Sequence, residues 1–244
     1  MLNKLFTKKQ QYEIINKIGQ EEIMCIDAKI SNYEEKKLVA NRILEKVHNG
    51  DVIGFGSGTT SCLAVEAIAQ KLEKENISIT AVPTSDIIEK KCKELNIKTA
   101  TLNEADIDWA FDGADEVDEN GNMIKGMGAA MFKEKLNILN SPKVYILVDQ
   151  SKYVKYLGEK HPIPIECYPA SINYVEMKLK KLGAKSIELR RKNNEIVYTD
   201  SHNVILDTWF EKELIKKELE DNIKLITGVI ETGLFINYDN VEIL

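Results

Sequence analysis

The chain contains 244 residues, and its 33 basic and 39 acidic side chains give a formal net charge of −6 at pH 7. Hydrophobic residues make up 43% and charged residues 30% of the chain, which is typical of a globular protein and excludes a disordered one. The length allows one large domain, alone or with a smaller second domain. The acidic balance argues against nucleic acid or an anionic membrane surface as the main partner.

Neither a membrane span nor a metal centre is predicted. The sequence holds no run of about 18 uninterrupted apolar residues, and its basic N-terminus lacks the apolar core and small-residue cleavage site of a secretion signal. The four cysteines show no C-x-x-C spacing and the three histidines lie far apart, which gives little support to a zinc or iron–sulfur site. We therefore expect reduced thiols packed as small core residues and a cytoplasmic protein.

The first predicted elements follow a lysine-rich lead-in at residues 1–31, an N-terminal extension to which the sequence assigns no role. Ser31, followed three residues later by Glu34, indicates a capping box that opens a helix, and Gly50 lies just past the end of that helix. Apolar strands and amphipathic helices then alternate. Strands are predicted at 52–55, 77–82, 97–100, 109–111 and 144–148, and helices after Gly58 and at 87–95.

Strands that alternate with helices predict an α/β fold, an open parallel Rossmann-like sheet with helices on both faces and right-handed crossovers. In such sheets ligands bind outside the carboxyl ends of the strands. Four predicted strand ends run into small or polar residues, at Gly56–Thr60, Thr84–Asp86, Asp112–Asp115 and Asp149–Lys152. The crevice that these segments line is the expected site.

The pattern changes after Gly158, where three prolines punctuate an extended segment. It is followed by a predicted helix at 171–182, β-rich stretches at 186–191 and 196–206 around a turn at Asn193-Asn194, a helix at 211–226 and a strand at 229–237. This β-α-β-β-α-β order predicts a smaller α+β ferredoxin-like second domain. We assign residues 158–229 to it, and residues 32–157 with about 230–244 to the catalytic α/β domain.

A glycine-rich turn, GFGSGTTS from Gly54 to Ser61, leads from the first strand into the next helix. Glycine lets backbone N–H groups approach an anion closely, and the helix N-terminus adds a favourable dipole. The turn is neither G-x-G-x-x-G nor a P-loop ending in G-K-[ST], so it indicates a compact phosphate and not a nucleotide. Tight packing alone is the alternative interpretation.

Carboxylates gather in the segment DGADEVD, which starts at Asp112 directly after an apolar strand. Only Gly113 and Ala114 separate Asp112 from Asp115, and they leave room for a substrate. Like-charged neighbours in a crevice raise each other's pKa, which suits proton transfer. We interpret the remaining acidic residues as a solvated turn: Glu116, Asp118 and Glu119.

Lys125 precedes a second glycine-rich turn, which again opens a helix. On that helix Glu134 lies four positions after Ala130 and four before Ile138, so it falls on the apolar stripe. A carboxylate among methyl groups is costly to ionise, and its pKa should therefore rise toward neutrality, as a general base requires. The alternative is a surface glutamate paired with a neighbouring lysine.

Together these segments resemble the ribose-5-phosphate isomerase type A family. The resemblance runs from about Lys36 to the C-terminus, and the motifs that carry it are GFGSGTTS, the PTSD turn, DGADEVD, IKGMGAAMFKEK, VDQSKYV with LGEKHPIPIE, YTDSHNVILD and GVIETGLF. It implies an aldose–ketose isomerase that interconverts ribose 5-phosphate and ribulose 5-phosphate without a metal or nucleotide cofactor. It also implies a homodimer or homotetramer, and its fold agrees with the predicted elements.

The resemblance further implies the site residues. Glu134 matches the family's catalytic base, Asp112 and Asp115 its acidic pair, and Lys125 the lysine of its K-G-x-G turn. The other substrate-binding residues that it implies are Ser57, Gly58, Thr59, Thr60, Gly113, Ala114, Gly126, Met127, Gly128 and Lys152. Lys36 matches, more loosely, a lysine that reaches the phosphate in some members.

Three positions depart from the family pattern. Ser57 stands where threonine is commoner and keeps the hydroxyl, whereas Met127 stands where glycine or arginine is usual. Ser201-His202 replaces an Asn-Gly turn in the second domain. None of these changes removes a group that the reaction needs, although Met127 could alter the fit of the substrate.

The matching residues predict proton transfer through a cis-enediolate. Asp112 helps to open the sugar ring, Glu134 takes the C2 proton and returns it to C1, and Lys125 with the N–H groups of the adjacent turn meets the developing negative charge. The alternatives are a non-catalytic module that senses a sugar phosphate, and another isomerase or an acyl-CoA transferase of related architecture. The presence of all three residues together argues against the sensing module.

Overall fold

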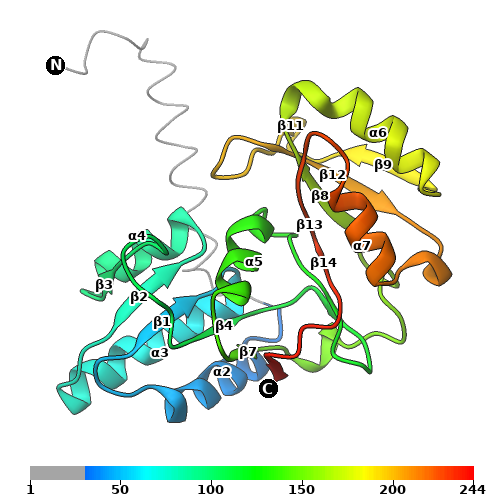
Figure 1. The fold of residues 1–244 in the computed structure, drawn as a ribbon. Helices are drawn as coiled ribbons and strands as arrows, with labels where there is room; N and C mark the ends of the chain where they lie inside the picture. The colour runs from blue at the N-terminus through cyan, green and yellow to red at the C-terminus, as the bar shows by residue number, and fades with distance from the viewer. Residues whose placement is uncertain (1–30) are drawn as a thin grey trace, which may run out of the picture.

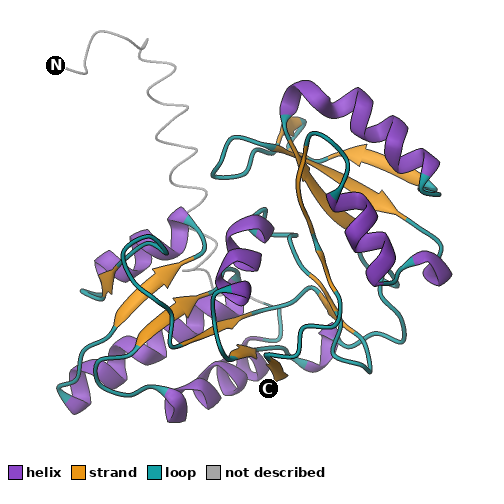
Figure 2. Cartoon of the chain, in the orientation of Figure 1, coloured by secondary structure: helices purple, strands orange, loops and turns teal. Residues whose placement is uncertain are grey.

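The computed structural model describes residues 31–244, which form two packed regions connected by extended strands (Figures 1 and 2). The predicted N-terminal extension at 1–31 therefore lies, except for its last residue, outside the described residues. The larger region is built on a parallel sheet, and the smaller one, at the upper right of Figure 1, on an antiparallel sheet.

The larger region contains a six-stranded sheet in the order β15-β7-β4-β1-β2-β3. Its strands are β1 (Val52–Phe55), β2 (Thr80–Pro83), β3 (Lys98–Thr99), β4 (Trp109–Asp112), β7 (Val144–Ile146) and β15 (Val241–Ile243). All neighbouring strands pair in parallel. This arrangement confirms the predicted open α/β sheet.

Helices cover both faces of this sheet. They are α2 (Tyr33–Arg42), α3 (Thr59–Glu75), α4 (Asp86–Glu94) and α5 (Met131–Leu139), and Figure 1 shows α2 and α3 on one side of the sheet and α5 on the other. Side chains alternate between the two faces, as a β-strand requires. Ile53 and Phe55 share a core with Ile68 of α3, whereas Ala110 of β4 shares a second core with Ile138 of α5.

The start of α2 differs from the prediction. Asn32 occupies the N-cap in a left-handed conformation, with φ of 56°, and makes no side-chain capping hydrogen bond. The predicted capping box of Ser31 and Glu34 is therefore wrong, because the chain enters the helix one residue later. A 3₁₀ turn (Ile43–Lys46) continues from the helix toward Gly50.

The smaller region has the predicted β-α-β-β-α-β order. Its elements are β8 (Ile163–Cys167), α6 (Ile172–Lys181), β9 (Ser186–Leu189), β12 (Val204–Trp209), α7 (Lys217–Lys224) and β13 (Val229–Thr232). The four strands pair antiparallel in the order β13-β8-β12-β9. Apolar side chains from this sheet and from both helices form a core of their own.

Two details of the smaller region bear on the predictions. The expected turn at Asn193-Asn194 is present, because both residues have positive φ and connect β10 (Arg191–Lys192) to β11 (Glu195–Ile196). The helix expected over 211–226 is instead a 3₁₀ turn (Lys212–Leu214) followed by the shorter α7.

A third, three-stranded sheet connects the two regions. Its strands, β14 (Leu234–Phe235), β6 (Met123–Ile124) and β5 (Glu116–Val117), are too short for periodicity to reveal. Glu116 is fully buried there, and its carboxylate accepts hydrogen bonds from the backbone N–H groups of Gly158, Lys160 and His161 at 2.6–2.7 Å. The interpretation of Glu116 as part of a solvated turn is therefore wrong: it anchors the segment that leads to β8.

The cysteines also depart from expectation at one position. Cys92 and Cys167 are buried free thiols, and burial raises their pKa values to about 12 and about 11. Cys62 is disulfide-bonded, so the expectation of reduced thiols is wrong for this residue. No helix in the described part of the chain combines the length and apolar character that a membrane span needs.

Candidate active site

A cluster of buried charged residues lies where the strand order of the large sheet reverses. The chain runs outward from β1 through β2 to β3 and returns to β4 on the other side of β1, and ligands of open α/β sheets bind at such a point. β4 ends at Asp112, and the turn after β1 passes directly over it. A Cβ atom at Gly56 would lie 2.2 Å from Oδ1 of Asp112, so this turn requires glycine.

Asp112, Lys125 and Glu134 form one buried cluster, with exposed fractions of 3%, 2% and 5%. Lys125 Nζ lies 3.0 Å from Asp112 Oδ2 and 3.4 Å from Glu134 Oε2, and it donates a hydrogen bond to the Gly113 carbonyl oxygen. Asp112 Oδ1 accepts from the N–H groups of Ser57 at 3.0 Å and Gly113 at 2.7 Å. Glu134 Oε2 is buried and accepts no hydrogen bond from the described residues, so its charged neighbour at the centre of the cluster is the ammonium group of Lys125.

Burial and neighbouring charges shift the pKa values of the residues in this cluster. Burial and the neighbouring Asp112 carboxylate raise the pKa of Glu134 to about 8, and burial raises the pKa of Asp112 as well. Burial opposes the charge of Lys125, but the carboxylates of Asp112 and Glu134 outweigh it and raise the lysine pKa. Near neutral pH the cluster therefore holds a fixed cation beside a carboxyl group that can bind or release a proton.

The first glycine-rich loop joins this cluster through Ser57. The Ser57 hydroxyl lies 2.7 Å from the hydroxyl of Thr84, which follows β2, so the ends of β1, β2 and β4 meet as predicted. Gly58, with φ of 89°, is the N-cap of α3, and Thr60 is buried in the first helical turn. The N-terminus of this 17-residue helix can attract an anion held by the loop.

The second glycine-rich turn lies beside Asp115. The Met127 N–H donates to Asp115 Oδ2 at 2.9 Å, and the Ala129 N–H donates to the Gly126 carbonyl oxygen at 3.0 Å. Gly126 has φ of +105°, a conformation that L side chains rarely adopt. Met127 is 39% exposed, so the residue that departs from the family pattern lies at the surface of the turn.

Lys152 is placed with a different set of residues. It ends a 3₁₀ turn (Gln150–Lys152) whose N-cap is Asp149, and the Asp149 carboxylate accepts from Asn32 at 3.2 Å. Lys36 of α2 is buried against the same group: burial lowers its pKa, the Asp149 charge opposes that shift and the Lys152 charge adds to it. Two lysines thus flank Asp149 at the end of β7.

A comparison with protein-family models finds ribose 5-phosphate isomerase A (phosphoriboisomerase A), which matches residues 80–244. The chain belongs to this family. The ribose-5-phosphate isomerase A of Methanocaldococcus jannaschii is 37% identical over 214 residues, which cover 87% of this chain and 94% of the relative. That of Picrophilus torridus is 38% identical over 201 residues, 82% of this chain and 88% of the relative.

Solved structures of ribose 5-phosphate isomerases have the same fold as this isomerase A family member. The structure of the M. jannaschii ribose 5-phosphate isomerase A superposes with a TM-score of 0.82 at 36% identity and covers 87% of this chain and 95% of the other. A D-ribose-5-phosphate isomerase in complex with phospho-erythronic acid also has a TM-score of 0.82 at 36% identity, and it covers 88% and 95%. The Plasmodium falciparum enzyme has a TM-score of 0.80 at 33% identity, with 86% and 93% covered.

Two residues of this isomerase A family member contact the site region but escaped the sequence analysis. Arg190, from the smaller region, donates to the carbonyl oxygens of Gly126 and Met127. Lys135, next to Glu134 on α5, is buried among acceptors from the smaller region. The sequence does draw attention to Arg190, because the chain has only three arginines among its 33 basic residues and two of them are adjacent, at 190 and 191.

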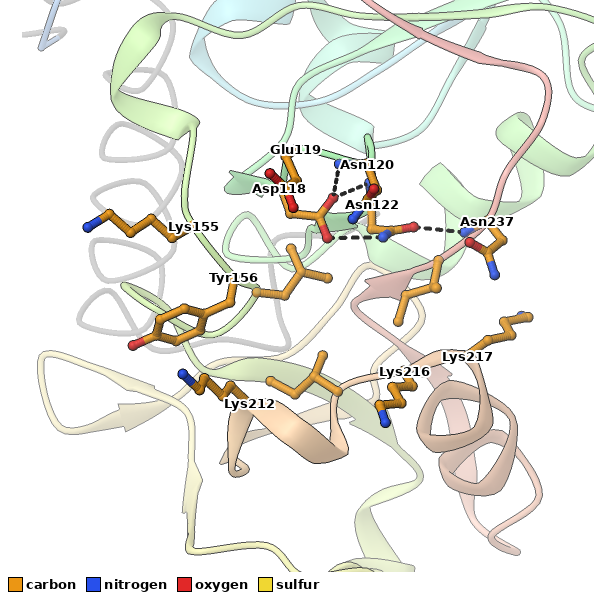
Figure 3. Close-up of a pocket in the computed structure, with 13 residues that line it drawn as sticks. Asp118, Glu119, Asn120, Asn122, Lys155, Tyr156, Lys212, Lys216, Lys217 and Asn237 are labelled. Carbon is orange, nitrogen blue, oxygen red and sulfur yellow. Dashed lines mark hydrogen bonds between the residues drawn. The ribbon is translucent and has the colours of Figure 1, made fainter.

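A separate hollow of about 390 Å³ lies between the two regions of this family member (Figure 3). It is lined by the turn at 118–122, the segment at 155–157, the 3₁₀ turn and start of α7 at 212–217, and residues 236–237. Asp118 accepts hydrogen bonds there from the backbone of Asn120 and Asn122. None of the predicted catalytic residues lines this hollow, so it is distinct from the candidate active site.

Proposed function

We propose that this chain interconverts D-ribose 5-phosphate and D-ribulose 5-phosphate through a cis-enediolate, with Glu134 as the general base. The observation that carries the proposal is Oε2 of Glu134, buried without a hydrogen bond from the described residues and 3.4 Å from Lys125 Nζ, in a member of the ribose 5-phosphate isomerase A family. The related isomerase solved with phospho-erythronic acid supports a small sugar phosphate as the ligand.

Glu134 carries the proton between two carbon atoms. Its carboxylate removes the proton from C2 of the open-chain aldose, the C–H electrons form the C1–C2 double bond, and O1 takes the negative charge. The protonated carboxyl then delivers the proton to C1, while O2 becomes the ketone oxygen and its proton passes to O1. A pKa of about 8 suits both steps, because the group can act as base and as acid near neutral pH.

Lys125 stabilises the charge that develops on the sugar oxygens. Its ammonium group is fixed by Asp112 and by the Gly113 carbonyl oxygen before substrate arrives, so little reorganisation is needed. The Gly128 N–H of the adjacent turn supplements it, while the Met127 N–H of that turn is held by Asp115. A positioned donor of this kind contributes about 3–4 kcal/mol to transition-state stabilisation in well-studied enzymes.

Asp112 has a second task in this proposal. Its burial between Lys125 and the Ser57 N–H places a carboxylate at the mouth of the glycine loop, where it can exchange a proton with the ring oxygen and the C1 hydroxyl during ring opening. Gly113 and Ala114, which carry little or no side chain, leave this approach open. Two carboxyl groups with raised pKa values thus divide the work of ring opening and isomerisation.

The phosphate is bound away from the reacting carbons. We assign it to the loop of Ser57, Gly58, Thr59 and Thr60 at the N-terminus of α3, with the cations of Lys152 and Lys36 supporting it. Binding energy from this remote group then aligns C1 and C2 with Glu134.

The test is isomerisation of ribose 5-phosphate in the presence of EDTA, followed by NMR detection of the ketose, with unphosphorylated ribose as the matched control. We expect ketose from the phosphorylated sugar only, since the proposed route uses no metal and depends on the phosphate. Binding of ribose 5-phosphate without any ketose would favour the sensing module. Conversion of another aldose phosphate in preference to ribose 5-phosphate would favour a related isomerase.

Assembly, domain division and location extend the proposal. The separate apolar core of the smaller region supports residues 158–229 as a second domain beside 32–157 and about 230–244.

Exposed apolar side chains on the smaller region, among them Tyr168 (59%) and Leu225 (81%), support a homodimer or homotetramer, which light scattering after gel filtration would measure. A cytoplasmic location suits a charged sugar phosphate that does not cross membranes, and cell fractionation would test it.

A further inference from the structure

Arg190 connects the smaller region to the second glycine-rich turn. It lies between β9 and β10 and is 9% exposed. Its Nη1 donates to the Gly126 carbonyl oxygen at 2.6 Å and to the Met127 carbonyl oxygen at 3.2 Å. Its Nη2 lies 3.6 Å from the Met127 sulfur atom. One guanidinium group from the second region therefore contacts two consecutive peptide units of the turn that leads into α5.

The guanidinium is itself held in place. Asp207, on β12, accepts from Nε at 2.9 Å and from Nη2 at 2.5 Å, a bidentate pair that fixes the plane of the group. The backbone of Arg190 is also fixed, because its N–H donates to the Ile205 carbonyl oxygen and its carbonyl oxygen accepts from Val197. A lysine could not reproduce this arrangement, since it offers a single ammonium in place of a planar fork.

The carbonyl contacts determine where the N–H groups of the turn point. In a trans peptide the C=O and N–H bonds are antiparallel, and the described residues contain no cis peptide. Because the Gly126 carbonyl faces Arg190, the Met127 N–H points the other way, where Asp115 accepts it at 2.9 Å. By the same geometry, the Gly128 N–H points away from Arg190.

We propose that Arg190 is a positioning residue for the isomerisation: held by Asp207, it keeps the Met127 N–H on Asp115 and the Gly128 N–H facing the bound sugar. This inference rests on the proposed function and deepens it, because it makes the second region part of the catalytic apparatus without contact between Arg190 and substrate. Arg190 acts on the transition state through the turn and leaves the phosphate loop unchanged.

The experiment compares Arg190→Met and Arg190→Lys with the control Arg191→Met, whose exposed guanidinium donates to the Asn194 carbonyl oxygen in the β10–β11 turn. Circular dichroism and thermal unfolding establish the folded fraction. We expect kcat per folded molecule to fall about 10- to 100-fold in Arg190→Met and less in Arg190→Lys, with KM changed less than kcat. Arg191→Met should match the wild type, and the acid limb of the pH profile should keep its midpoint, since the base is untouched.

Wild-type kcat in folded Arg190→Met would overturn the positioning role, because a purely structural residue lowers the unfolding temperature without changing turnover of the folded protein. Should Arg190→Met fail to fold, Asp207→Leu decides the question: it keeps the guanidinium and removes both oxygens that anchor it, and wild-type kcat in that variant overturns the proposal. A wild-type protein that forms no ketose from ribose 5-phosphate would count against the proposed function instead, so the two failures are distinguishable.

Discussion

Two consecutive residues of α5 carry buried charges of opposite kinds. Glu134 lies in the cluster with Asp112 and Lys125, and its Oε2 accepts no hydrogen bond from the described residues. Lys135 Nζ lies within 3.0 Å of four acceptors, the carboxylates of Glu220 and Glu231 and the carbonyl oxygens of Thr232 and Leu234, which share its three N–H donors. Among the described residues, the Glu134 carboxylate is thus incompletely partnered and the Lys135 ammonium is fully partnered.

The difference shows how burial can serve two purposes on one helix. A fully partnered buried charge fixes the position of an element, because moving it would leave several polar groups without hydrogen bonds. An incompletely partnered carboxylate is costly to ionise and therefore titrates near neutrality. Lys135 thus ties α5 to the smaller region, and this attachment holds Glu134 at its place beside Lys125.

The largest expected effect comes from removing the base. Glu134→Gln keeps the shape of the side chain but cannot accept the C2 proton, so kcat should fall by about 10²–10⁴-fold while the protein folds normally. Steady-state kinetics with ribose 5-phosphate and circular dichroism measure the two quantities. Near-normal turnover in the folded variant would show that another group is the base.

Removing the neighbouring charge should affect stability first. Lys135→Met leaves Glu220 and Glu231 buried without their shared cation, and it should lower the free energy of unfolding by about 3–5 kcal/mol. The matched control is Lys133→Met on the same helix. Lys133 pairs with Asp86 and Asp200 at a more exposed position, so this change should cost at most about 1 kcal/mol.

Urea denaturation measures both variants of this pair. If Lys133→Met and Lys135→Met lower the free energy of unfolding equally, the buried Lys135 cluster does not stabilise the fold more than the exposed Lys133 pairs. A loss of turnover in folded Lys135→Met as large as that in Glu134→Gln would contradict the division between a structural and a chemical cluster.

The same helix shows what the sequence could and could not predict. Periodicity places Glu134 on the apolar stripe, because the core face of a helix is a local property that repeats every 3.6 residues. The partners of Lys135 lie 85 to 99 positions later in the chain, and no local pattern reports them. Arg190 escaped for the same reason, since its contacts with Gly126 and Met127 span more than 60 positions.

The secondary structure shows the same difference between local patterns, which the sequence reveals, and contacts distant in sequence, which it does not. Strands long enough to show an apolar run, such as β1 and β4, were predicted to within a residue, whereas the two-residue strands β5 and β6 were not found. Glu116, on β5, was misread because an acidic run next to a turn usually faces solvent, and only the returning segment at 158–161 supplies the N–H groups that justify its burial.

A smaller effect concerns pH. Because the active form of Glu134 is the carboxylate and its pKa is raised to about 8, kcat/KM should rise about tenfold per pH unit below that value and level off above it. Asp115→Asn provides the comparison. Burial and the Asp112 charge raise the pKa of Glu134 most, the Lys125 charge opposes them, and the Asp115 charge raises it further. Removing the Asp115 charge should therefore move the acid limb to lower pH. An acid limb near the ordinary glutamate value of 4.5 would contradict the desolvated base.

The last prediction concerns the pH dependence of stability, and it tests the raised pKa without substrate. Below about pH 4.5 Glu134 is protonated in both the folded and the unfolded chain. Between about 4.5 and about 8 the unfolded chain loses this proton and the folded chain keeps it, so the wild type loses stability as pH rises, up to the folded pKa. Glu134→Gln has no such titration, and other groups cancel in the comparison.

The unfolding temperature of Glu134→Gln minus that of the wild type should therefore increase across this window and stay constant above about pH 8. About 1 kcal/mol of differential stability shifts the unfolding temperature of a protein of this size by about 2–4 °C, which thermal scans at several pH values resolve. A temperature difference that does not change with pH would mean that Glu134 is ordinarily solvated, and the distinction between the two clusters of α5 would fail.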